Sequence, residues 1–146
     1  MNIWGIDLGG TKIECAVLDA ETLSVIERQR IPTEADQGYD HILSQINKLI
    51  GQVAQKVGEM PARIGLATPG VLEPESQTMK NCNTTCMNGR RMKEDLERVL
   101  SLPVRLANDA NCFALAEALM GAGKNYPDAE VVWGIIMGTG VGGGLV

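Results

Sequence analysis

The chain has 146 residues, of which 45% are hydrophobic and 21% are charged, and its net charge is −5 at neutral pH. This composition is typical of a globular protein, and no apolar run approaches the roughly 20 residues of a membrane-spanning helix. The negative charge and the lack of a Lys and Arg run argue against nucleic acid as a partner. Because the first residues show no signal-peptide pattern, we expect a cytoplasmic protein that binds neither membrane nor nucleic acid.

The first part of the chain is predicted to form three strands and then a helix. Ile3 to Asp7, Ile13 to Leu18 and Leu23 to Ile31 are rich in β-branched residues and are separated by short turns. From Gly38 onward, apolar residues recur at three- and four-residue spacing, which indicates an amphipathic helix. Gly58 is the predicted end of that helix, because glycine is favoured just after a helix.

Strands and helices alternate further along. Strands are predicted at Arg63 to Ala67 and Val104 to Ala107, and helices at Met92 to Leu100 and at about Asp109 to Met120. Three adjacent strands followed by this alternation predict an α/β fold with a mixed sheet, antiparallel at first and parallel where helices connect the strands. The order is that of the ribonuclease-H-like lobe found in actin, hexokinases and related ATPases.

The end of the chain repeats the pattern of its beginning. Val131 to Met137 and Val141 to Val146 are predicted strands, joined by a Gly/Thr turn like the one between the first two strands. A segment this short cannot fold as a domain by itself. We therefore expect a first lobe over residues 1–124, followed over residues 125–146 by a linker and the first hairpin of a truncated second lobe.

The turn between the first two strands has the composition of a phosphate-binding loop. Gly9 and Gly10 allow backbone N–H groups to approach an anion, Thr11 adds a hydroxyl, and Lys12 adds a cation. Asp7 offers a carboxylate that suits a hydrated magnesium ion. An ordinary Gly-Gly hairpin turn explains the same residues. A similar turn occurs later in the chain at Gly138, Thr139 and Gly140. Its presence favours the phosphate interpretation, because two such turns could hold a polyphosphate from both sides.

Asn108 and Asp109 stand between a predicted strand and a predicted helix. This is the carboxyl end of a sheet strand, where open α/β folds bind their ligands. Asn and Asp are also favoured helix caps and need no other role at this position. The spacing leaves both a catalytic and a capping interpretation open.

Four cysteines, Cys15, Cys82, Cys86 and Cys112, are expected to be free thiols in a reducing cytoplasm. Cys82 and Cys86 are close enough in the sequence to suggest two of the ligands of a metal site. Zinc needs about four ligands, however, and the single histidine, His41, lies far away in the sequence. Free loop cysteines are the better interpretation.

Four stretches together resemble the ROK family of bacterial sugar kinases and sugar-responsive repressors. They are DLGGTK at residues 7–12, GLATPG at 65–70, LANDAN at 106–111 and GTGVGGG at 138–144. The match spans essentially the whole chain in the family's order. Within the family the chain looks most similar to the fructokinase and N-acetylhexosamine kinase group.

The resemblance implies ATP-dependent phosphorylation of a hexose, namely glucose, fructose, mannose or an N-acetylhexosamine, with magnesium at the phosphates. Asp109 corresponds to the base that accepts the proton of the attacked hydroxyl, and Asn108 and Gly70 match positions that hold the sugar. The first phosphate motif is matched by Asp7, Gly9, Gly10 and Thr11, and the second by Gly138, Thr139 and Gly140. These assignments suit phosphoryl transfer, which depends mostly on positioning and charge neutralisation.

The chain departs from the family pattern in two ways. An aromatic residue is usual in the loop over residues 81–89, where this chain has Cys86, so the identity of the sugar is open. Asn81 and Asn83 in that loop can still hydrogen-bond sugar hydroxyls. The resemblance also implies a structural zinc cluster that would lie beyond this chain, so we expect the site to be incomplete and the chain alone to be inactive. A homodimer is expected for the whole enzyme.

Two rival functions belong to other classes. A sugar-sensing repressor of the same family would carry a helix-turn-helix domain, for which the start of the first strand at Ile3 leaves no room. An actin-like assembly protein would have no evident need for Asn108 and Asp109 beside a sugar loop. The sequence therefore favours the kinase, and the alternative is a sugar-sensing regulator of the same family that lacks a helix-turn-helix domain.

Overall fold

The computed structural model describes residues 2–137 and 141–146 and divides the chain into two compact units, Met1–Leu106 and Ala107–Val146. The division falls within a strand, β7 (Val104–Asn108). No helix in the described residues is long and apolar enough to cross a membrane. The predicted domain division at residues 124 and 125 stays a prediction.

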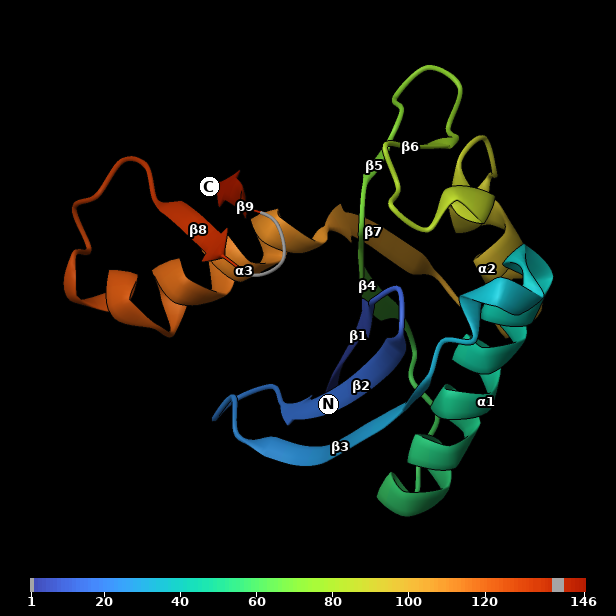
Figure 1. The fold of residues 1–146 in the computed structure, drawn as a ribbon. Helices are drawn as coiled ribbons and strands as arrows, with labels where there is room; N and C mark the ends of the chain where they lie inside the picture. The colour runs from blue at the N-terminus through green and yellow to red at the C-terminus, as the bar shows by residue number, and fades with distance from the viewer. Residues whose placement is uncertain (1, 138–140) are drawn as a thin grey trace. The chain divides into compact units, whose positions relative to one another are not determined.

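The first unit is built on a five-stranded sheet with the order β3-β2-β1-β4-β7 (Figure 1). Its other strands are β1 (Asn2–Leu8), β2 (Lys12–Asp19), β3 (Val25–Pro32) and β4 (Ile64–Thr68). β2 is antiparallel to both β1 and β3, whereas β4 is parallel to β1. The predicted mixed sheet is confirmed. Short turns join the antiparallel strands, whereas the parallel strand β4 is reached through a helical crossover.

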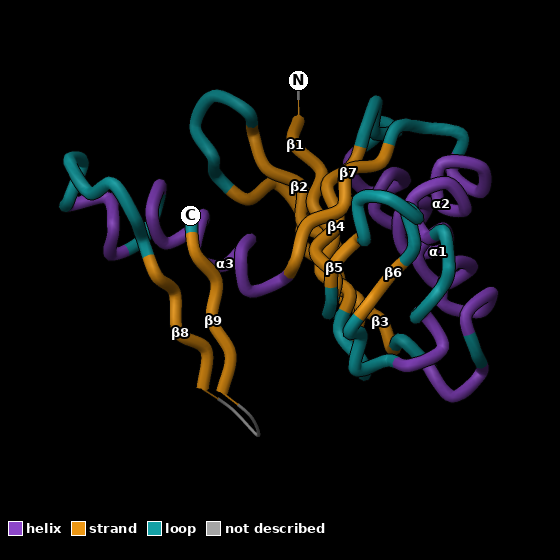
Figure 2. The backbone as a smooth tube through the Cα atoms, turned by 90° about the horizontal axis from the view of Figure 1, so that it is seen from above, coloured by secondary structure: helices purple, strands orange, loops and turns teal. Residues whose placement is uncertain are grey.

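Two helices, α1 (Tyr39–Val57) and α2 (Met92–Leu100), lie on the same side of this sheet (Figure 2). α1 contacts β2, β3 and α2. It ends as predicted at Gly58, which has a left-handed φ of 83° and whose N–H donates to the carbonyl oxygen of Ala54. A left-handed residue at this point stops the helix and satisfies one of its last carbonyl groups.

The core lies between the sheet and α1. Alternate residues of the strands point to this side, so Ile6, Leu8, Ile13 and Val17 are buried against the apolar stripe of the helix. That stripe consists of Ile42, Ile46, Leu49, Ile50 and Val53. Each fully buried aliphatic side chain stabilises the fold by about 1.5–3 kcal/mol. This layer therefore holds the strands, and with them the loops at their ends, in place.

Short elements complete the first unit. A small antiparallel hairpin, β5 (Val71–Leu72) with β6 (Met79–Lys80), was not expected from the sequence. Its strands have two residues each, too few to show a two-residue period. Two short 3₁₀ helices, η1 (Ala35–Gln37) and η2 (Thr85–Met87), lie in the connections.

The second unit consists of α3 (Asp109–Leu119) packed on the hairpin of β8 (Trp133–Met137) and β9 (Val141–Leu145), with η3 (Ala122–Asn125) between them. β8 and β9 pair antiparallel. The predicted helix and both predicted strands are confirmed. The buried residues that the structure describes in this unit are small: Ala114, Gly134 and Gly144.

Candidate functional site

The turn between β1 and β2 exposes backbone N–H groups. The Gly9 N–H donates to the Lys12 carbonyl oxygen at 3.0 Å, and a side-chain carbon at Gly9 would lie only 2.9 Å from that oxygen. Across residues 2–137 and 141–146, the N–H groups of Gly10 and Thr11 donate to no acceptor. Because Gly10, Thr11 and Lys12 are exposed, this turn can offer N–H donors and a cation to an external anion.

Thr33, the residue directly after β3, hydrogen-bonds to the backbone of this turn and was not singled out from the sequence. It is completely buried, its N–H donates to the Thr11 carbonyl oxygen at 2.9 Å, and its hydroxyl donates to the Gly9 carbonyl oxygen at 2.7 Å. The only local signal is a polar residue after a strand, which is too common to single it out.

Gly70 brings a second loop against the site. Its φ is +119°, and a side-chain carbon there would lie 2.6 Å from the Lys80 carbonyl oxygen and 2.7 Å from the Cys82 sulfur. Only glycine tolerates both the conformation and the contact. The loop that follows β4 therefore lies directly against the segment that contains Asn81.

The loop with Asn81 and Asn83 lies beside the phosphate-type turn. A side-chain carbon at Gly10 would be 3.5 Å from the Thr84 hydroxyl oxygen, so the turn and the loop are neighbours. Asn81, which has a left-handed φ of 59°, and Asn83 are both exposed. Asp7 and Ala67 are register partners in β1 and β4. The first unit thus gathers Asp7, the turn, Gly70 and both asparagines at the carboxyl ends of two parallel strands.

Asn88 closes the amide-bearing loop, a role that the sequence did not reveal. Its Oδ1 accepts from the Cys82 N–H at 2.9 Å, and its Nδ2 donates to the Cys82 carbonyl oxygen at 3.2 Å. Burial, and then the neighbouring Cys86, raise the pKa of the Cys82 thiol. Cys86 is partly exposed. Asn88 therefore fixes the loop, and Cys86, which packs against the core, stands where the resemblance expects an aromatic ring.

In the second unit, Asn108 and Asp109 have different local roles. The Asn108 side chain caps α3, because its Oδ1 accepts from the N–H groups of Ala110 at 3.1 Å and Asn111 at 3.3 Å. Asp109 is the first residue of the helix, and its Oδ1 accepts from the Ala110 N–H at 2.7 Å. A carboxylate in the first turn also suits the helix dipole. The capping interpretation thus applies to Asn108, while the predicted second phosphate turn, residues 138–140, lies outside the described residues.

Magnesium could be held at Asp7, which is exposed at the end of β1. In the described part of the chain, no group of three or more His, Cys, Asp or Glu residues could hold a metal ion. Magnesium commonly uses one or two carboxylates and takes its other ligands from water and substrate phosphates. A single carboxylate beside a turn that can offer N–H donors to an anion fits that mode.

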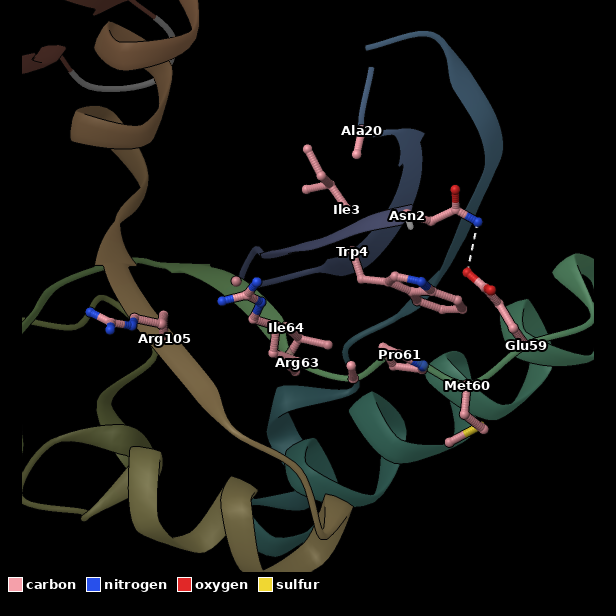
Figure 3. A pocket seen from close by; sticks show the side chains of 12 residues that line it. Asn2, Ile3, Trp4, Ala20, Glu59, Met60, Pro61, Arg63, Ile64 and Arg105 are labelled. Carbon is pink, nitrogen blue, oxygen red and sulfur yellow. Dashed lines mark hydrogen bonds between the residues drawn. The ribbon is translucent and has the colours of Figure 1, made fainter. Parts of the chain in front are cut away.

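A separate pocket of about 480 Å³ lies at the other end of β1 (Figure 3). Asn2 borders it and donates to Glu59 Oε1 at 2.7 Å. The indole N–H of the buried Trp4, which also lines it, has no hydrogen-bond partner among the residues that the structure describes. None of the predicted site residues that the structure describes lines this pocket. The candidate site residues of the first unit therefore lie outside this cavity.

The family model described as ROK matches residues 3–146. The chain belongs to the ROK family. Among curated proteins, this ROK chain is 39% identical over 142 residues to the N-acetylgalactosamine kinase AgaK of Shewanella sp., covering 97% of the chain and 44% of the relative. It is 40% identical over 143 residues to the N-acetyl-D-glucosamine kinase of Escherichia coli, covering 98% and 45%. The ROK chain thus spans less than half the length of these relatives.

Solved structures confirm the fold of the ROK chain. A ROK family glucokinase from Streptomyces griseus, determined in complex with glucose and AMPPNP, superposes with a TM-score of 0.80 at 26% identity. The match covers 100% of this chain and 44% of the glucokinase. The predicted actin- and hexokinase-type lobe is therefore confirmed.

Proposed function

We propose that this chain is the N-terminal portion of an ATP-dependent hexose kinase. The observation that carries the proposal is the β1–β2 turn, which exposes the N–H groups of Gly10 and Thr11 beside a loop of exposed amides. N–H donors suit phosphate, and amides suit sugar hydroxyls. The kinase names of the relatives agree with this pairing.

The nucleotide side of the proposed site is the first turn. Gly9, Gly10, Thr11 and Lys12 would hold ATP phosphates through backbone N–H groups, a hydroxyl and an ammonium. Asp7 would hold magnesium through water, and magnesium when bound neutralises charge on the phosphates. Gly138, Thr139 and Gly140 remain the predicted second phosphate motif.

The sugar side comprises Gly70, Asn81, Asn83 and Asn108. The names of the relatives favour an N-acetylhexosamine over an unsubstituted hexose. Asp109 would accept the proton of the attacked hydroxyl as that oxygen bonds to phosphorus, which is the role of a general base. A zinc cluster outside this chain, a homodimer and a cytoplasmic location stay predictions.

The test is Asp109→Asn in the full-length protein. Because Asn108 already caps α3, the melting temperature should barely change. The amide cannot accept the proton, so kcat should fall by about 10²–10⁴-fold, while sugar binding weakens far less. The measurement is sugar-dependent ADP release with N-acetyl-D-glucosamine, alongside thermal unfolding.

A matched control is Asp128→Asn, which removes an exposed carboxylate from the same unit and should leave kcat unchanged. If Asp109→Asn keeps a near-normal kcat, Asp109 is not the base. If the wild-type protein consumes no ATP with any hexose, the kinase proposal itself fails.

A further inference from the structure

Thr33 is a buried polar residue whose hydrogen bonds both go to the turn between β1 and β2. It is 0% exposed, and its hydroxyl and N–H donate to the carbonyl oxygens of Gly9 and Thr11 at 2.7 and 2.9 Å. Thr33 lies 24 residues after Gly9 in the sequence, so these contacts exist only once β3 has paired with β2.

The bond to Gly9 sets the direction of a neighbouring donor. The Gly9 carbonyl and the Gly10 N–H belong to one peptide unit, and in a trans peptide the two groups point in opposite directions. A hydroxyl that holds the carbonyl oxygen inward therefore turns the Gly10 N–H outward. Within the described chain that N–H has no acceptor, and Gly10 is exposed.

We infer that Thr33 is a positioning residue that orients the Gly10 amide toward a phosphate of the nucleotide. The inference rests on the proposed function, because it takes the turn to be the nucleotide site. Thr33 would not touch the nucleotide, since it is buried behind the turn. Preorganised donors bind more tightly because less ordering is needed when the ligand arrives.

The experiment compares Thr33→Val and Thr33→Ser in the full-length protein. Valine replaces the hydroxyl by a methyl group of similar size, so the Gly9 carbonyl loses its partner and the Gly10 amide loses its fixed direction. Since a hydrogen bond to a charged group changes affinity by about tenfold or more, the Kd for ATP should rise by that factor. The Kd for N-acetyl-D-glucosamine should stay unchanged, and Thr33→Ser, which keeps the hydroxyl, should bind ATP like the wild type.

Two further measurements separate positioning from stability. Val53→Ala removes buried volume from α1, so it should lower the melting temperature without changing the Kd for ATP. In the wild type, amide NMR should show the Gly10 N–H signal shifting on ATP titration, a result that does not depend on the folding of any variant.

The outcomes distinguish the two proposals. If the wild type binds ATP but Thr33→Val binds it equally well, or if the Gly10 signal does not shift, the role of Thr33 is overturned and the kinase stands. If the wild type binds no ATP, the proposed function fails and the role of Thr33 falls with it.

Discussion

Glu14 on β2 joins two arginines of the neighbouring strand β3. Its Oε1 accepts from Arg28 Nε and its Oε2 from Arg30 Nε, both at 2.6 Å. Burial raises the pKa of the Glu14 carboxyl, but the hydrogen bonds and charges of the two arginines outweigh burial, so the pKa is lowered from 4.5. One carboxylate thus offsets two adjacent cations that would otherwise repel each other on one strand.

The lowered pKa predicts how stability depends on pH. A carboxyl with a lower pKa in the folded state stabilises the fold above its unfolded pKa of about 4.5, and this contribution is lost as pH falls through the folded pKa. Glu14→Gln should therefore lower the melting temperature at pH 7 and make the acid loss of stability shallower. Glu130→Gln, at an exposed position, is the control. Parallel pH profiles for wild type and Glu14→Gln would contradict this.

At the scale of elements, α3 packs closely on the hairpin of β8 and β9 at two glycines. Gly134 and Gly144 are register partners in β8 and β9. A side-chain carbon at Gly144 would lie 2.2 Å from the Ala110 carbonyl oxygen, and one at Gly134 would lie 2.9 Å from the Phe113 ring. Asn111 adds a hydrogen bond, because its Oδ1 accepts from the Leu145 N–H at 3.3 Å. The first turn of α3, which includes Asp109, is thereby fastened to β9.

Gly144→Ala should loosen that contact. The added carbon collides with helix backbone, which cannot rotate away as a side chain can, so we expect destabilisation of at least about 1–3 kcal/mol. The matched control is Gly142→Ala on the same strand, where an added carbon meets no described atom within 4 Å. Native-state hydrogen exchange of the α3 amides in both variants measures the loss, and equal protection in the two variants would show that the glycine contact is unimportant.

At the scale of the whole molecule, the two compact units differ in how much apolar surface they bury. The first unit encloses a continuous core of aliphatic residues from the sheet and α1. In the second unit the described buried residues are Ala114 and two glycines, whereas Trp133, Met137 and Val141 are 66%, 80% and 79% exposed. Burial of apolar area is the main source of folding stability. The second unit therefore has little folding stability of its own.

Native-state hydrogen exchange should report this difference. Amides of β1, β2 and α1 are expected to exchange slowly through global unfolding, while those of α3, β8 and β9 exchange by local opening at lower free energy. The measurement is exchange of the 146-residue chain followed by NMR. Equal protection in both units would contradict the prediction.

The sequence by itself determined the features that depend on neighbouring residues. The spacing of apolar residues predicted α1, Gly58 marked its end, and the strand pattern predicted the mixed sheet. The composition of residues 7–12 predicted the turn between β1 and β2, and the role of that turn at phosphate stays a prediction. Such signals are readable because helix period, strand period and glycine conformation are local properties of the chain.

Only the tertiary structure decided which distant residues support the site. Thr33, Asn88, Gly134 and Gly144 carry no local signal specific enough to single them out, because each acts on a partner that pairing or packing brings near. The structure likewise assigned the cap of α3 to Asn108, although Asn108 and Asp109 are both favoured caps. The direction of a peptide group or a carboxylate is set by contacts across the fold, and sequence spacing does not encode it.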